Sequence, residues 1–116
     1  MIRVKRVYTE EKKEDGFRIL VDRLWPRGVS KEKADIDLWI KELAPSTELR
    51  RWFGHDVEKW NEFREKYKKE LIDKKEFLDQ IKNIEKNYGT VTLVYASEDE
   101  KYNLAVVLKR ILSDNY

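Results

Sequence analysis

The sequence contains no cysteine and only one histidine, His55, among its 116 residues. Without cysteine there is no thiol nucleophile, disulfide or sulfur-ligated metal, and a single histidine does not favour a histidine-based zinc site. A glycine-rich phosphate loop and a dinucleotide-binding fingerprint are absent as well. We therefore expect neither a metal nor a cofactor.

Long apolar runs are also missing, since none approaches the roughly 20 residues that cross a bilayer. The first residues alternate as in a strand and do not resemble a signal peptide. We therefore expect a cytoplasmic protein that does not contact membranes. Neither sign of charge dominates: 25 lysine and arginine residues stand against 23 acidic ones, for a net charge of +2. This balance permits an anionic partner without requiring one.

Apolar and charged residues each make up 41% of the sequence. A disordered chain combines low hydrophobicity with high net charge, and this sequence has neither property. The length suits one folded unit with a core of its own. We predict a single domain over residues 1–116.

Apolar patterns predict about three β-strands. The first, near residues 2–7, alternates apolar and basic side chains, which indicates one wet face or an edge position. The second, 17–22, is apolar on both faces and should be central, and the third is 90–96. The connection over 8–16 is short for a parallel crossover. Two arrangements of the first and second strands therefore remain open. They could be parallel, with a single helical turn between them, or they could form an antiparallel pair.

Helical spacing of apolar residues predicts amphipathic helices over 57–72 and 75–87, the second ending at Gly89. The segment 102–112 is apolar around most of its circumference and should be a buried helix. Shorter capped helical turns are predicted at 30–34, 35–43 and 46–54. Together these elements predict a small α/β domain with a largely parallel open sheet covered by helices.

Charged residues follow the second strand at once, at Asp22, Arg23 and Arg27. The carboxyl ends of strands are where open α/β sheets bind ligands. An Asp22 held ionised by the neighbouring arginine could accept a proton or position a water, unless the pair only fixes the turn. Arg27 beside Gly28 suits anion recognition, or is an exposed arginine in a turn.

Other candidate site residues lie further along the chain. His55 is the one side chain whose ordinary pKa permits proton transfer near neutrality, although it sits at a junction where it could simply cap a helix. We predict catalytic roles for Asp22 and His55. Predicted ligand contacts come from both strand ends: Arg23, Trp25, Arg27, Tyr95, Ser97, Asp99 and Asn103. Ser97, Asp99 and Asn103 have an alternative role as caps of the last helix.

Several blocks of the sequence resemble a known family. They are VDRLWPRGVSK at 21–31, LAPSTELR at 43–50, WFGHD at 52–56 and LVYA at 93–96, with Asp99 and Asn103 after the last. Together they are similar to the short YeaO-like branch of the family called domain of unknown function 488. The resemblance implies a cytosolic prokaryotic α/β domain with a small, largely parallel sheet, and it implies no activity.

Longer members of that family carry a strand ending in Asp-x-Arg and later Cys-Ala-Glu and Cys-His-Arg motifs. In this sequence Arg23 directly follows Asp22, and the cysteine motifs are replaced by Tyr95-Ala96-Ser97 and Asn103-Leu104-Ala105. Thiol chemistry of the longer members therefore does not transfer to this chain.

Two functions remain as hypotheses. The first is a small enzyme or a small-molecule binder that holds an anionic ligand at the carboxyl ends of the strands. The alternative is a nucleic-acid-binding or regulatory module, whose contacts would come from exposed aromatic rings and from basic side chains: Arg3, Lys5, Arg6, Arg50 and Arg51. A protein-interaction module, with an exposed apolar face on a long helix, is a third possibility.

Overall fold

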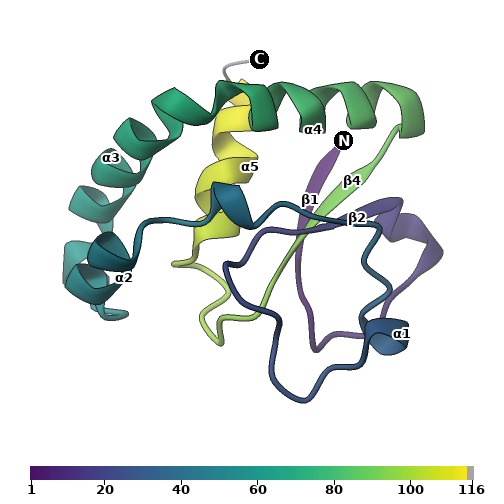
Figure 1. The fold of residues 1–116 in the computed structure, drawn as a ribbon, viewed down its shortest axis with the longest axis horizontal. Helices are drawn as coiled ribbons and strands as arrows, with labels where there is room; N and C mark the ends of the chain where they lie inside the picture. The colour runs from purple at the N-terminus through teal and green to yellow at the C-terminus, as the bar shows by residue number, and fades with distance from the viewer. Residues whose placement is uncertain (115–116) are drawn as a thin grey trace.

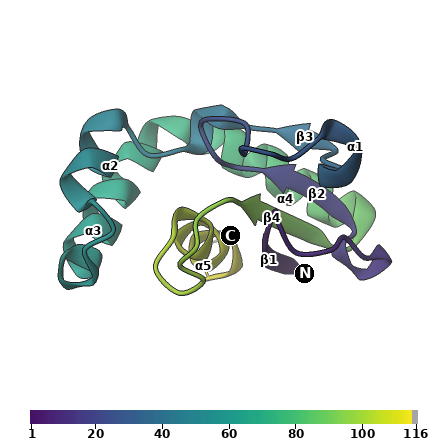
Figure 2. The ribbon, with the colours of Figure 1, turned by 90° about the horizontal axis from the view of Figure 1, so that it is seen from below.

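Four parallel strands form the centre of the computed structural model, which describes residues 1–114 (Figures 1 and 2). The strands are β1 (Ile2–Arg6), β2 (Phe17–Leu20), β3 (Leu38–Trp39) and β4 (Val91–Tyr95). Their order in the sheet is β1-β4-β2-β3, and every neighbouring pair is parallel. The predicted parallel α/β sheet is confirmed, with one strand more than expected.

Strand β4 lies between β1 and β2 and is buried along its whole length. Because the strand is buried on both faces, the backbone N–H and C=O groups along both of its edges need hydrogen-bonding partners within the sheet. Leu93 is accordingly in register with Val4 of β1 and with Ile19 of β2. The first two strands are therefore not neighbours, and the antiparallel arrangement is excluded. The segment between them contains a single 3₁₀ turn, Lys13–Asp15.

Strand β3 corrects the prediction of a helical turn over 35–43. Leu38 and Trp39 pair with Ile19 and Leu20 of β2, and only Lys41–Leu43 forms a 3₁₀ turn. The backbone N–H of Ile40 donates to the Leu20 carbonyl at 3.0 Å, which extends the ladder. Without β3, the backbone N–H and C=O groups on this edge of β2 would lack partners. Pairing them stabilises the strand conformation more than local propensity favours a helical turn.

Within residues 1–114, five α-helices surround the sheet: α1 (Lys31–Ala34), α2 (Thr47–Phe53), α3 (Trp60–Leu71), α4 (Lys75–Tyr88) and α5 (Leu104–Asp114). Most ends lie where the sequence predicts them. Ser30 and Ser46 accept hydrogen bonds as N-caps of α1 and α2, and Gly54 ends α2 in a left-handed conformation. Among residues 1–114, no helix is long and apolar enough to cross a membrane.

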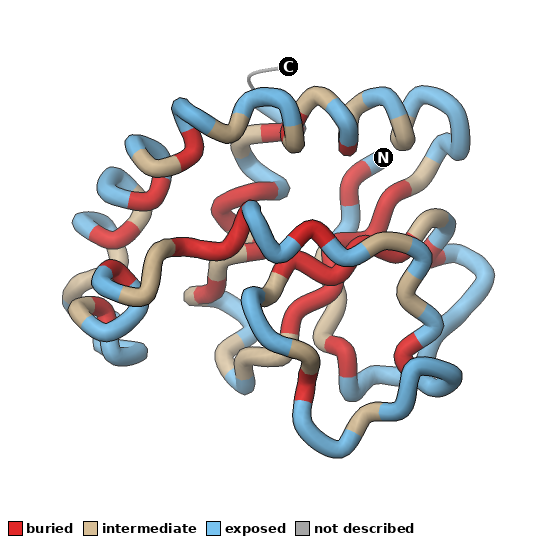
Figure 3. Tube along the Cα trace, viewed as in Figure 1, coloured by how far each residue is buried: buried red, intermediate tan, exposed pale blue. Residues whose placement is uncertain are grey.

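The two faces of the sheet are covered differently. One face joins α3, α4 and α5 in a large apolar cluster that includes Ile19, Leu93 and Tyr67. The other face has a small cluster in which Leu20 and Val94 pack against α1 and the segment before it. Figure 3 shows buried residues concentrated along the strands and on the inner sides of the helices.

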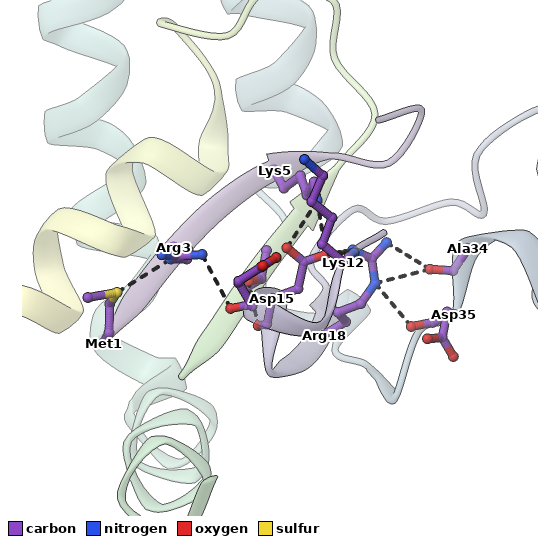
Figure 4. A network of polar contacts seen from close by, with 10 residues as sticks. Met1, Arg3, Lys5, Lys12, Asp15, Arg18, Ala34 and Asp35 are labelled. Atoms are coloured by element: carbon purple, nitrogen blue, oxygen red, sulfur yellow. Dashed lines mark hydrogen bonds and ion pairs between the residues drawn. The ribbon is translucent and has the colours of Figure 1, made fainter. Parts of the chain in front are cut away.

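A network of ion pairs supports the second face (Figure 4). The Asp15 carboxylate accepts from Arg18 Nη1 at 2.6 Å, from Lys5 Nζ at 3.0 Å and from the Lys12 backbone N–H at 3.0 Å. The Arg18 guanidinium also donates to the Ala34 carbonyl at 2.8 Å. These contacts join β1, the turn before β2, β2 itself and α1. All the charges are paired, which is the condition for burying them.

Candidate functional site

A cavity of about 670 Å³ lies at the carboxyl edge of the sheet. Most of its lining comes from the turn after β2, the region of α2, and the loop between β4 and α5, which can be followed in Figure 1. Tyr8, after β1, and Phe63, in α3, complete it. Seven of the predicted site residues line it together: Asp22, Arg23, Trp25, Arg27, His55, Ser97 and Asn103. The volume lies within the range usual for small-molecule sites.

Arginine is the dominant charged residue of the lining. Arg23 and Arg27 come from the turn after β2, and Arg50 and Arg51 come from α2. Within residues 1–114, the side chains of Arg27, Arg50 and Arg51 form no hydrogen bond or ion pair. Asp22 is the one carboxylate in the described lining. The cavity therefore carries an excess of positive charge, with guanidinium groups free to bind an anion.

Arg23 does not form the predicted pair with Asp22. Its Nη1 donates instead to the Thr47 hydroxyl at the start of α2, which ties the turn to that helix. Asp22 uses Oδ2 to accept from the Ala96 backbone N–H at 2.7 Å, and its carbonyl accepts from Trp39 Nε1 at 2.7 Å. Asp22 therefore links the ends of β2, β4 and β3.

Burial raises the pKa of Asp22 to about 6, against the lowering effects of the Ala96 N–H and of the Arg50 charge. The arginine whose charge lowers this pKa is Arg50, and not the neighbouring Arg23, whose guanidinium is turned toward Thr47. A pKa near 6 leaves Asp22 mostly ionised at neutral pH and able to take up a proton just below it.

Aromatic side chains form a large share of the apolar part of the lining. Trp25 donates from Nε1 to the Val29 carbonyl at 2.7 Å and meets the Trp39 ring edge-on, with 5.7 Å between ring centroids. Further aromatic rings that the sequence analysis did not assign to the site also line the cavity: Tyr8, Phe53, Phe63 and Tyr102. The Tyr8 hydroxyl donates to the Arg27 carbonyl at 3.1 Å, which closes the cavity beside the turn.

His55 lies exposed at the far end of α2, directly after Gly54, and has a left-handed φ of 59°. Histidine is among the few residue types that adopt this conformation with some frequency. Its ring centroid is 6.3 Å from that of Phe53, and its side chain forms no hydrogen bond within residues 1–114. The structure thus places it on the lining with Asp22, and its catalytic role stays a prediction.

The loop before α5 is held by its own polar side chains. Asn103 Oδ1 accepts from the Val106 N–H at 3.1 Å, so Asn103 caps α5 as the sequence analysis allowed. Asp99 accepts from the N–H groups of Lys101 and Tyr102, and it lies outside the lining. Tyr95 also lies outside the lining, because it is only 2% exposed and packs in the main core.

Arg50 and Arg51 are the site residues that the sequence analysis placed elsewhere, among possible nucleic-acid contacts. Their position depends on how α2 docks: the Ser46 N–H and hydroxyl donate to the Glu70 carboxylate of α3, at 2.8 and 2.6 Å. The available signal was a short helix, bounded by Pro45 and Gly54, inside a block shared with the family. These residues predict the helix α2, but they do not predict that it packs against α3.

The fold and this cavity define a small, parallel α/β domain with an arginine-lined cleft at the carboxyl edge of its sheet. Over residues 1–116 the chain matches the family model DUF488-N3i, described as the inactive DUF488-N3 subclade, and it belongs to this family. The predicted family relationship is thereby confirmed.

Bacterial proteins are similar in sequence to this chain over nearly its whole length. The uncharacterized protein YeaO of Escherichia coli K12 is 43% identical over 107 residues, which span 92% of each chain. The uncharacterized protein Rv3073c of Mycobacterium tuberculosis H37Rv is 38% identical over 112 residues, 97% of this chain and 93% of the relative. No solved structure matches the chain.

Proposed function

We propose that this chain is a binding domain for a small anion of the phosphate type, held in the cleft at the carboxyl edge of the sheet. The proposal rests chiefly on the four arginines, Arg23, Arg27, Arg50 and Arg51, that line one cavity together with a single carboxylate. Planar guanidinium groups match the oxygens of phosphate and carboxylate groups in two-point hydrogen bonds. The N-terminus of α5, which reaches the lining at Leu104, adds a favourable partial positive charge.

Binding without turnover is the form of the proposal that we favour. The family model that matches the chain is described as an inactive subclade, which supports a binding role. The predicted catalytic roles of Asp22 and His55 remain a separate hypothesis, which their shared position on the cavity lining supports. A cytoplasmic location, expected from the lack of a long apolar run and of a signal-peptide pattern in the sequence, is part of the proposal.

Three of the five basic residues on which the nucleic-acid alternative draws are already engaged in contacts within the fold. Lys5 is paired with Asp15, Arg3 donates to the Glu14 carbonyl, and Arg6 donates to the Ser97 carbonyl. These contacts use donors that a polynucleotide backbone would need. We therefore treat nucleic acid as an alternative outcome of the experiment.

The test is calorimetric titration of the chain with inorganic phosphate and pyrophosphate, alongside thermal unfolding in their presence. A ligand at about 100 times its dissociation constant should stabilise the fold by roughly 2.7 kcal/mol. Arg50→Gln should weaken binding by about tenfold or more, because it removes charge-assisted hydrogen bonds. The matched control is Arg110→Gln, which alters an exposed arginine of α5 outside the cavity.

Failure of the wild-type chain to bind either anion, or equal binding by Arg50→Gln, would contradict the proposal. Binding of short oligonucleotides alone, with an affinity that falls steeply as salt is added, would favour the alternative, because displaced counterions give that dependence.

A further inference from the structure

Asp22 has an unused hydrogen-bond acceptor inside a cavity that otherwise suits anions. Its Oδ2 accepts from the Ala96 N–H at 2.7 Å, and its Oδ1 accepts nothing within residues 1–114. In that part of the chain, the one occluded side-chain polar atom without a partner is Arg64 Nε. Asp22 Oδ1 is therefore open to solvent, and Asp22 is part of the cavity lining. An ionised carboxylate has several acceptor positions to fill.

We infer that Asp22 selects phosphate-type ligands that also carry a hydroxyl group, so that the ligand is a phosphate ester of a hydroxylated compound, such as a sugar phosphate or a nucleotide. The inference rests on the proposed anion-binding function and narrows its ligand class. In this arrangement the arginines hold the phosphate, and Asp22 Oδ1 accepts a hydrogen bond from the hydroxyl.

The size of the cavity supports an organic ligand. At about 670 Å³ it is far larger than one phosphate ion, which would fill only a fraction of it. The remaining wall includes the rings of Trp25, Phe53 and Tyr102, which offer apolar surface to a carbon skeleton. A simple inorganic anion would leave this surface in contact with water.

The charges favour a hydroxyl over the other common donors. A bare anion close to Asp22 meets a like charge, whereas a ligand hydroxyl placed between them satisfies the carboxylate. An ammonium group would also donate to Asp22, but the surrounding guanidinium groups of Arg23, Arg27, Arg50 and Arg51 would repel it. A neutral donor is therefore the best match to this mixture of charges.

The decisive comparison uses glycerol 3-phosphate and propyl phosphate, which share a carbon skeleton and differ in two hydroxyl groups. We expect wild-type protein to bind glycerol 3-phosphate roughly tenfold more tightly or better, because a hydrogen bond to a charged acceptor is replaced by none. Asp22→Asn keeps an oxygen for the Ala96 N–H and removes the charge, so the preference should fall to about threefold or less. Propyl phosphate should still bind to this variant.

The matched control is Asp37→Asn. Asp37 also accepts a hydrogen bond from a backbone N–H, that of Arg18 at 2.9 Å, but it lies outside the cavity lining. This variant should keep the full preference for glycerol 3-phosphate. If Asp22→Asn does not fold, the ¹³C resonance of the Asp22 carboxyl in wild-type protein replaces it. That resonance should shift with glycerol 3-phosphate and not with propyl phosphate.

Equal binding of the two esters overturns this inference and leaves the proposed anion-binding function intact. Tighter binding of 3-aminopropyl phosphate than of glycerol 3-phosphate overturns the choice of a hydroxyl. A preference that survives in Asp22→Asn overturns the role of Asp22. If no phosphate compound binds, inorganic phosphate and pyrophosphate included, the proposed function fails along with the inference.

Discussion

Two aspartates bracket strand β2, and they differ in almost every respect. Asp15 comes just before the strand, is 4% exposed, and receives hydrogen bonds from Lys5, Arg18 and the Lys12 N–H. Asp22 comes just after the strand, is less buried, and receives a single hydrogen bond through its carboxylate, from Ala96. The amino edge of the sheet thus has a satisfied charge, and the carboxyl edge has an unsatisfied one.

The pKa values of the two groups move in opposite directions. Burial alone would raise the pKa of Asp15, but the Lys12 N–H and the charges of Lys5 and Arg18 together hold it below its usual value. At Asp22 burial prevails and raises the pKa to about 6. Strongly perturbed groups in a cleft are candidates for function, whereas fully paired ones more often serve structure. The comparison separates a structural carboxylate, Asp15, from Asp22, the one for which we propose a function.

Removing Arg18 should give the largest effect, because it breaks the network around Asp15. We expect Arg18→Met to lower the free energy of unfolding by about 3–5 kcal/mol, since one partner of a buried ion pair is lost and the other remains charged. Urea unfolding at pH 7, followed by circular dichroism, measures this change.

The control for this substitution is Arg110→Met, which removes an exposed pair with Asp114 on α5. Such pairs contribute about 1 kcal/mol or less. A loss below about 1 kcal/mol for Arg18→Met as well would show that the Asp15 network adds little to stability, and the contrast between the two aspartates would disappear.

The elements that could be predicted from the sequence are those with local causes. Apolar runs define β2 and β4, and capping residues such as Ser46 and Gly54 define the ends of α2. The pairing of β1 and β2 with β4 joins residues far apart in the chain, and a local pattern carries no information about it. Strand β3 was missed because its two residues are too few to show any periodicity.

The residues of the candidate site likewise fall into those that local sequence predicts and those that only the packing of the fold brings to the site. Asp22, Arg23 and Arg27 follow a recognisable strand, so their place at the carboxyl edge could be predicted. Arg50 and Arg51 reach the same cavity only because α2 docks against α3 and the turn, through contacts that side chains make across the fold. Likewise, the turn of Arg23 toward Thr47 depends on that docking and has no signal in the sequence.

Asp22→Asn should raise the free energy of unfolding at pH 7, whereas Arg18→Met should lower it. A carboxyl whose pKa is higher in the folded than in the unfolded state holds its proton more tightly in the folded state. Its contribution to folding stability is therefore full below about pH 4 and is lost as the pH rises through about 6. The difference between 3.8 and about 6 corresponds to about 3 kcal/mol, which partial access to water reduces to about 2.

The neutral amide avoids this cost, so the variant should gain about 2 kcal/mol at pH 7 and almost nothing at pH 4. Urea unfolding at the two pH values measures the gain, with Asp37→Asn as the control outside the cavity. A loss of stability at pH 7 would mean that the charged Asp22 is well satisfied, like Asp15.

The smallest effect should appear in the pH dependence of sulfate binding, because sulfate keeps a constant charge between pH 5 and 7.5. Ionisation of Asp22 places a negative charge beside the bound anion, so affinity should fall as the pH rises through about 6. Two like charges at an effective dielectric constant near 20 repel by about 1–2 kcal/mol after screening, which is about fivefold to thirtyfold in affinity.

His55, the other residue with a predicted catalytic role, also lines the cavity, so the experiment must distinguish its effect from that of Asp22. The calorimetric series at pH 5, 6 and 7.5 therefore includes Asp22→Asn and His55→Gln beside the wild-type chain. We expect His55→Gln to keep the fall in affinity that Asp22 causes and Asp22→Asn to lose it. If the fall disappears in His55→Gln and persists in Asp22→Asn, the imidazole controls the charge of the cleft. Asp22 would then differ from Asp15 in its hydrogen bonding alone.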